Sequence, residues 1–222
     1  MSTNTYHITF PSIHGSTGRA FDAEADAPTE ALAVRSVLEA CAKQGVTLDY
    51  VVLSHLHGLD GAWLDGLRLN GCKVEDSDLS GASWRAARIK GTTFRNVLAD
   101  GRTHFDDSLI WNVEFAHCTM NGLHAPRLNG ISVHFNQCNM DRWDVTDGRL
   151  ADLKVFNTSC SGWKAAMATF RHCDQFTSIL AASDLTEPQR AAVRAMSASN
   201  GDRLSAQAFA DVIEAQLTSA NK

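Results

Sequence analysis

Two histidines and an aspartate near position 57 have types and spacing that could bind a metal ion. His55, His57 and Asp60 lie within six residues of one another, and imidazole nitrogens and carboxylate oxygens are common ligands of zinc. A catalytic zinc site needs three such ligands and an open position, at which bound water is activated for hydrolysis. Whether these residues can do this depends on the elements that position them.

The segment resembles the metal motif His-X-His-X-Asp-His of the metallo-β-lactamases. Here Asp60 lies one place too late, no histidine follows it, and no αββα sequence pattern supplies a second ligand set. The repeat described next accounts for the same residues by placing His57, Leu59 and Asp60 at the small, central and following positions of one unit. A zinc hydrolase through His55, His57 and Asp60 is therefore kept as an alternative only.

A five-residue repeat runs through the middle of the chain. Its units include Ala62-Trp-Leu-Asp-Gly and Leu67-Arg-Leu-Asn-Gly, and a small residue recurs two places before an apolar one. An amphipathic helix needs apolar residues every three or four positions and a half-buried strand every second position, so a period of five fits neither. Fixed self-similarity is typical of solenoids, whose units bury their apolar face by stacking on neighbours.

These units resemble the pentapeptide-repeat family, whose pattern is Ala-(Asp/Asn)-Leu-X-X, over more than half of the chain. The resemblance implies an all-β solenoid, a right-handed quadrilateral β-helix with four units per coil, in which the central residue and the residue two places before it point inward. We expect three parts: an N-terminal β-hairpin plus helix cap at 1–52, the pentapeptide-repeat β-helix at 53–180, and a C-terminal helical hairpin at 181–222.

The frame slips once, at the six-residue segment 97–102. If this segment counts as one unit, Phe94, Phe115 and Phe135 fall one coil apart and are predicted to stack in a single column of rings. Trp143 and Trp163 take the inward position where the family's pattern wants a small residue, next to the smaller centres Val145 and Ala165.

Around Pro126 the sizes of the two inward residues of a unit are reversed. Leu123 and Leu128 stand where the repeat has a small residue, and Ala125 and Gly130 stand where it has the larger central one. Because proline cannot donate to a sheet ladder, we expect a distorted coil or an outward loop over residues 123–131.

The remaining histidines and the cysteines are predicted to be structural. His104 and His124 are expected one coil apart on one outer face, close enough to share a metal ion or to titrate together. The sequence shows no third ligand in their column, so we expect solvated surface and no cofactor. Three of the six cysteines fall on small inward positions, where they act as small hydrophobic residues: Cys72, Cys118 and Cys138.

Both ends of the chain have their own patterns. Apolar and polar residues alternate over 6–10 and 21–25, which predicts a β-hairpin. Asp26 with Pro28 indicates the start of a helix and Gly45 its end. The apolar face of this helix is predicted at Leu32, Val37, Leu38 and Cys41. The N-terminal part is expected to cover the first coil, whose edge is otherwise exposed. The last predicted helix carries an apolar stripe that could pack on the final coil or form a homodimer: Phe209, Val212, Ile213 and Leu217.

Composition bounds the location and the partner. No apolar run reaches the roughly 18 residues that span a membrane, and scattered cysteines without a secretion signal indicate a cytoplasmic protein. The chain carries a net charge of −5, but residues 53–180 hold 14 acidic and 13 basic residues, which is a weak imitation of DNA phosphates. The candidate partner-binding residues are an early acidic cluster and two outward aromatics: Asp60, Asp65, Glu75, Asp76, Asp78, Trp111 and Phe156.

No catalytic constellation accompanies the repeat, which favours a binding protein over an enzyme. The resemblance to phage-encoded and quinolone-resistance-type members implies a bacterial or bacteriophage inhibitor or protector of a nucleic-acid enzyme such as DNA gyrase, acting by partial DNA mimicry without itself binding nucleic acid. The alternative is a scaffold or anti-defence protein that binds a host protein without mimicry.

Overall fold

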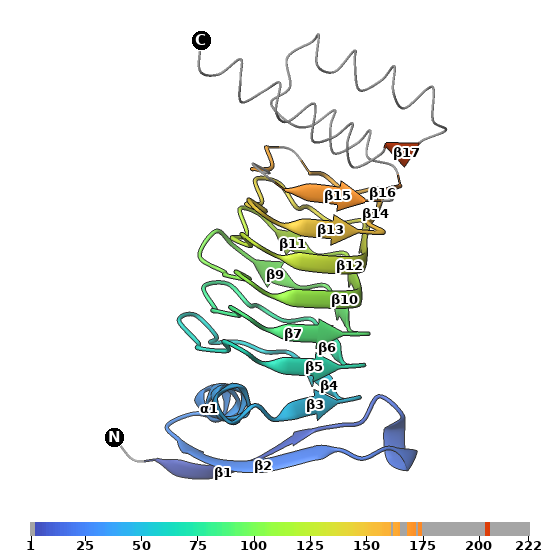
Figure 1. Ribbon diagram of the computed structural model, residues 1–222. Coiled ribbons are helices and arrows are strands. Elements are labelled where there is room, and N and C mark those ends of the chain that lie inside the picture. The colour runs from blue at the N-terminus through green and yellow to red at the C-terminus, as the bar shows by residue number, and fades with distance from the viewer. Residues whose placement is uncertain (1–2, 161, 165–167, 172, 175–202, 205–222) are drawn as a thin grey trace.

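The computed structural model shows an N-terminal cap beneath a tall stack of parallel strands (Figure 1). It describes residues 3–160, 162–164, 168–171, 173–174 and 203–204. The cap contains strands that pair antiparallel along their full lengths, a short connecting 3-10 helix and one α-helix: β1 (Asn4–Phe10), η1 (Gly15–Thr17), β2 (Phe21–Ala27) and α1 (Glu30–Gln44). The expected hairpin and helix are confirmed.

Helix α1 has a distinct cap at each end. The Thr29 hydroxyl accepts a hydrogen bond from the Leu32 N–H (3.4 Å), and Gly45 ends the helix with φ of 66°, a conformation that glycine adopts without strain. The expected start at Asp26–Pro28 is wrong, because Asp26 belongs to β2. Leu32 is also misplaced in the prediction: it is 39% exposed, and the buried face consists of Ala33, Val37, Leu38, Cys41 and Ala42. No helix among the described residues is long and apolar enough to cross a bilayer.

Above the cap, short strands recur every 20 or 21 residues, as Arg68 opposite Arg88 and Thr47 opposite Arg68 illustrate. One side of the solenoid, called here the β7 face, carries β3 (Thr47–Asp49), β5 (Arg68–Asn70), β7 (Arg88–Lys90), the first halves of β10 (Leu109–Ala116) and β12 (Asn129–Asn136), β13 (Arg149–Ala151) and β15 (Thr169–Arg171).

The next side, the β8 face, carries β4 (Val52–Ser54), β6 (Lys73–Glu75), β8 (Thr93–Arg95), the second halves of β10 and β12, β14 (Lys154–Phe156) and β16 (Cys173–Asp174), which pairs antiparallel with β17 (Arg203–Leu204). The third side, the β9 face, carries β9 (Leu98–Ala99) and β11 (Thr119–Met120). The fourth, the His124 face, is joined by single parallel bridges such as His104 to His124 and His124 to Asp144.

The aromatic column predicted for the core is confirmed. Phe115 lies opposite Phe94 in one ladder and opposite Phe135 in the next, with ring centroids 4.9 and 5.4 Å apart. The segment 97–102 absorbs its extra residue within one coil, because Met120 pairs with Ala99 in parallel register. The Trp143 and Trp163 rings also stack, with centroids 5.6 Å apart.

The corners explain the fifth position of the repeat. Each coil turns at the residue two places after a centre, and this residue has a positive φ, for example 77° at Gly66 and 53° at Asn96. Glycine and asparagine tolerate this left-handed conformation better than other residues, and the repeat places them there often.

The ladder begins before Leu53, where the sequence placed its start. Leu48 of β3 already pairs with Leu69. The repeat is hard to see at Leu48 because Val46, two places before it, is larger than the small residue that the repeat has there. The unit around His57 is also shifted. Leu56, 3% exposed, takes the inward position expected for His57, and its carbonyl accepts a hydrogen bond from the Asp78 N–H of the next coil.

The distortion expected around Pro126 is absent. Leu123, Ala125 and Leu128 are at most 2% exposed, and Gly130 pairs with Ile110 in unbroken register. The Pro126 carbonyl accepts from the Asp107 N–H (3.0 Å), and the ladder donors on this side are the N–H groups of the residues before and after the proline. Proline therefore occupies a position whose N–H the ladder does not use.

Candidate functional site

The β7 face carries an exposed apolar cluster. Leu109, Trp111 and Ile131 are 41%, 48% and 39% exposed, and Trp111 lies directly opposite Ile131 in the β10–β12 ladder. Ile110 points into the core and is 2% exposed, so both of its strand neighbours must face solvent. The outward prediction for Trp111 therefore agrees with its exposure, and two aliphatic neighbours accompany it.

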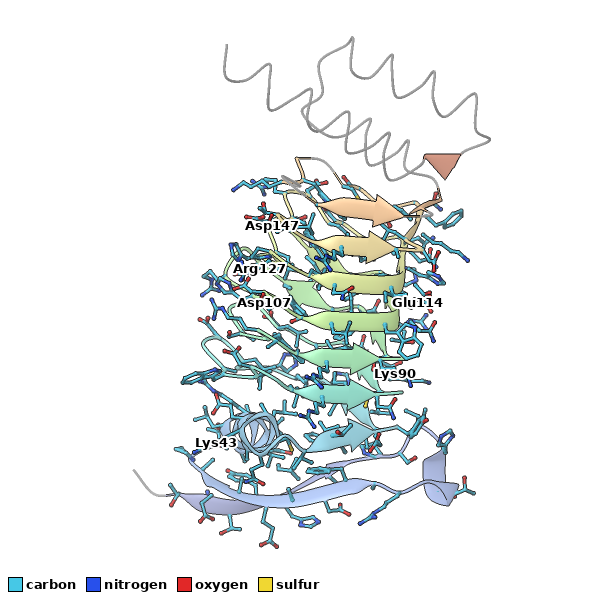
Figure 2. All side chains as sticks on the ribbon, in the orientation of Figure 1. Lys43, Lys90, Asp107, Glu114, Arg127 and Asp147 are labelled. Carbon is cyan, nitrogen blue, oxygen red and sulfur yellow. The ribbon has the colours of Figure 1, made fainter. Side chains whose placement is uncertain are left out.

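Two cations of β7 border this cluster. Arg88 lies opposite Leu109, and Lys90 lies opposite Trp111, with its Nζ 4.6 Å from the indole ring centroid. This geometry is a cation–π contact, which holds the ammonium group over the ring without neutralising its charge. Figure 2 shows Lys90 at the edge of the stacked strands.

Further basic residues extend the same face. Arg149 lies one coil beyond, opposite Asn129, and Arg68 lies opposite Arg88, an arrangement of like charges that costs stability in a sheet. None of these cations forms an ion pair with an acidic residue in the described part of the chain. We define the Trp111 patch as the surface formed by Arg88, Lys90, Leu109, Trp111, Ile131 and Arg149.

The acidic residues that the sequence groups together lie on three different sides. Asp60 and Asp78 belong to the β9 face, Asp65 to the His124 face, and Glu75 and Asp76 to the end of β6 and the corner that follows it. Sequence neighbours separate in this way because the chain turns a corner about every five residues. The structure therefore does not bring the five carboxylates into one surface.

Several of these carboxylates are already bound within the protein. Asp60 forms an ion pair with Arg102 at 2.9 Å, and Asp65 accepts hydrogen bonds from the Ser83 hydroxyl and the Trp63 indole, both at 2.6 Å. Such contacts reduce the charge that these residues offer to a partner.

Another corner shows the same neutralisation. In Figure 2, Asp107, Arg127 and Asp147 lie one above another along one edge of the solenoid. Arg127 Nε and Nη2 donate to the Asp107 carboxylate at 2.6 and 2.7 Å. These hydrogen bonds hold the pKa of Asp107 below its usual value, so the carboxylate is ionised and its charge is matched by the guanidinium.

The other predicted binding residues lie elsewhere. Phe156 is 52% exposed, but it ends β14 on the β8 face, aligned with Asn136, and is not part of the Trp111 patch. The stripe predicted for dimerisation lies outside the described residues, and a homodimer through it stays a prediction: Phe209, Val212, Ile213 and Leu217.

The histidines of the metallo-β-lactamase-like segment line a pocket between the cap and the first coil. His55 and His57 share this pocket of about 390 Å³ with His7 and Glu30. Within the described residues, however, the side chains that converge closely enough to hold a metal ion are those of His104, Asp106 and His124. The geometry gives no support to a zinc site at His55, His57 and Asp60.

The placement of His104 and His124 one coil apart on one face is confirmed, and their rings meet edge-on with centroids 4.9 Å apart. The sequence points to no third potential ligand near them, but one lies beside their column. Asp106 follows His104 by two residues, and its carboxylate lies between the two imidazoles. The signal in the sequence is the i, i+2 spacing of His104 and Asp106, which puts both side chains on the outer surface around the inward Phe105.

Comparisons with known proteins give matches among solved structures. No family model and no curated protein matches the chain. Among solved structures, full-length QnrB1, a plasmid-mediated fluoroquinolone resistance protein, is 14% identical with a TM-score of 0.37, covering 58% of this chain and 82% of QnrB1. A trypsin-treated QnrB1 variant is 16% identical with a TM-score of 0.39, covering 65% and 80%.

A protein from Parabacteroides merdae whose assignment as a glycosyl hydrolase is provisional is 8% identical, with a TM-score of 0.35 and coverage of 64% and 86%. The chain is similar to the QnrB1 pentapeptide-repeat proteins in its β-solenoid fold.

Proposed function

We propose that this protein is a non-enzymatic, cytoplasmic, right-handed quadrilateral β-helix of pentapeptide repeats that binds another protein through the Trp111 patch. One observation carries the proposal: an exposed tryptophan lies between exposed aliphatic side chains on a sheet face, next to cations without a described acidic partner. Exposed apolar clusters often mark interaction sites, and tryptophan and arginine are enriched among residues that dominate binding energy.

The chemistry of the patch fits an acidic protein surface with an apolar side chain at its centre. Arg88, Lys90 and Arg149 can attract carboxylates and orient the encounter, while Leu109 and Ile131 offer aliphatic contacts. A nucleic acid would supply phosphates for the same cations, but the chain's net charge of −5 opposes its approach. We therefore take the partner to be a protein.

A finer form of the proposal makes the partner a nucleic-acid enzyme, DNA gyrase first, through partial DNA mimicry. Its basis is the resemblance of the repeat to quinolone-resistance-type pentapeptide proteins. A mimic has to present unneutralised negative charge in place of phosphates, whereas Asp60 and Asp107 are hydrogen-bonded to arginines. These hydrogen bonds favour the alternative proposal, in which the protein is a scaffold or anti-defence protein that binds a host protein without mimicry.

The test compares partner capture by the wild type and by a double variant, Arg88→Glu with Trp111→Ala. A partner captured from bacterial lysate is purified, and its dissociation constant is measured for both proteins. We expect the double variant to bind at least about 100-fold more weakly, because hot-spot residues each contribute about 2 kcal/mol or more. Phe156→Ala removes an exposed aromatic side chain from the β8 face and is expected to bind like the wild type.

Equal binding by the double variant, or capture that disappears after nuclease treatment, would overturn the proposal. A gyrase supercoiling assay at micromolar protein tests the finer form. Inhibition or drug protection that the double variant loses would support gyrase as the partner, whereas no effect would remove the gyrase form and leave the protein-binding proposal to the capture experiment.

A further inference from the structure

A cluster of potential metal ligands lies on the His124 face, away from the Trp111 patch. His104 and His124 occupy the same position on successive coils, joined by a parallel bridge. Asp106 Oδ1 lies 2.6 Å from His124 Nδ1, and Asp106 Oδ2 lies 3.5 Å from His104 Nδ1. One ligand atom from each of the three side chains lies within 4.8 Å of the other two.

Among the residues that the structure describes, His104 Nδ1 has no hydrogen-bond partner, and this nitrogen is buried. Buried polar atoms are normally paired. Its nearest charged neighbour is the Asp106 carboxylate at 3.5 Å, a separation close to that between two ligands on one tetrahedral ion with bonds of about 2.0–2.1 Å. The unpaired nitrogen is thus aimed at a position that a metal ion could occupy.

Asp106 has the properties of an anionic ligand. The residue is only 7% exposed. Arg85 Nε donates to Oδ2 at 2.7 Å, and a carboxylate has enough lone pairs to keep this bond while binding an ion.

Asp144 supplies the outer support that metal-binding histidines usually have. Its Oδ2 lies 3.8 Å from His124 Nε2, so a small movement lets the Nε2–H donate to it. That hydrogen bond favours the tautomer with the proton on Nε2, the role carboxylates play behind ligating histidines in known sites. A metal ion bound at Nδ1 would then replace the 2.6 Å contact between Nδ1 and Asp106 Oδ1.

We propose that His104, Asp106 and His124 form a binding site for one divalent transition-metal ion, with zinc as the probe. Two imidazoles and a carboxylate suit zinc and its neighbours better than magnesium or calcium, which prefer oxygen ligands alone. The three protein ligands leave a coordination position for water or a partner's side chain. The site is independent of the protein-binding proposal, because it uses no residue of the Trp111 patch.

Binding at this site connects two successive coils, since its histidines are 20 residues apart in the chain. A metal ion that binds the folded state but not the unfolded chain stabilises the fold. We expect one zinc ion per chain, and a thermal midpoint that rises by several degrees when zinc is added to chelator-treated protein.

The experiment measures zinc binding by isothermal titration calorimetry, and cobalt substitution by its visible absorption, on the full chain. His124→Gln and Asp106→Asn each remove a ligand and are expected to weaken binding at least about 100-fold, whereas Asp144→Asn removes the outer support and is expected to weaken it about 10- to 100-fold. Circular dichroism and metal-free thermal unfolding show whether each variant is folded.

The paired variant His55→Gln with His57→Gln serves as the matched control and should bind zinc like the wild type. The proposal is overturned if the folded wild type binds no zinc, or if folded His124→Gln and Asp106→Asn bind it unchanged. Loss of binding in the His55/His57 variant alone would also overturn it and move the metal to the pocket beside the cap. If both ligand variants are unfolded, His104→Gln with the cobalt spectrum decides, and an unchanged spectrum contradicts the site.

Discussion

Phe115 is the residue on which the aromatic core centres. It contacts Phe94 on one side and Phe135 on the other, with centroids 4.9 and 5.4 Å apart, and the Trp143 ring meets it edge-on at 6.4 Å. Because the interior of a coil is filled by a few side chains only, none of these neighbours can move far to occupy the space of a missing ring.

We predict that Phe115→Ala lowers the free energy of unfolding by about 3–5 kcal/mol, the usual cost of removing a buried ring and leaving a cavity. Urea unfolding followed by circular dichroism measures it. Phe156→Ala, at an exposed position, is expected to change stability by less than about 0.5 kcal/mol. If Phe115→Ala lowers the free energy of unfolding no more than Phe156→Ala does, the rings are not packed as a column.

Single residues also show where prediction from the sequence succeeds and fails. Phe94, Phe115 and Phe135 could be placed because a five-residue period fixes inward positions without any knowledge of partners. Asp106 could not be placed beside the two histidines from their column alone, because its carboxylate reaches them from the neighbouring position of the same unit as His104.

At the scale of strands, Pro126 lies in an unbroken ladder. The general rule that proline interrupts sheets assumes that every N–H donates to the ladder. In this coil the N–H groups of Ala125 and Arg127 donate to the next coil, so the position between them accepts proline without loss. The acidic residues between 60 and 78 lie on different faces for a related reason: closeness in sequence does not mean a shared face when the chain turns at every unit.

The Asp107–Arg127 pair joins two successive coils and makes part of the stability depend on pH. Because the pKa of Asp107 is lowered in the folded state, the contribution is present above the ordinary aspartate pKa and is lost as pH falls through the lowered value. Asp107→Asn is expected to lose less stability than the wild type between pH 7 and pH 2, as measured by the urea midpoint at each pH. An identical decrease in both proteins would contradict this role.

At the scale of the whole molecule, the N-terminal cap closes the first coil. Arg35 of α1 donates to the carbonyls of Asp60 and Gly61 at 3.0 and 2.8 Å, and Glu39 accepts from the Trp63 N–H at 3.0 Å. These backbone groups belong to the first coil, and no further coil pairs with its lower edge in the described part of the chain. The charged side chains of the helix thus satisfy a sheet edge that otherwise invites self-association.

We predict that Arg35→Ala lowers the free energy of unfolding by about 1.5–3 kcal/mol, because it removes charge-assisted hydrogen bonds to two carbonyl groups. The uncovered edge is also expected to increase self-association, measured by sedimentation velocity over a range of protein concentrations. Lys43→Ala is the matched control, since Lys43 is an exposed cation on the same helix (Figure 2) without an ion pair among the described residues. If the two variants unfold and sediment alike, the cap holds the first coil through its apolar face alone and the Arg35 bonds add nothing.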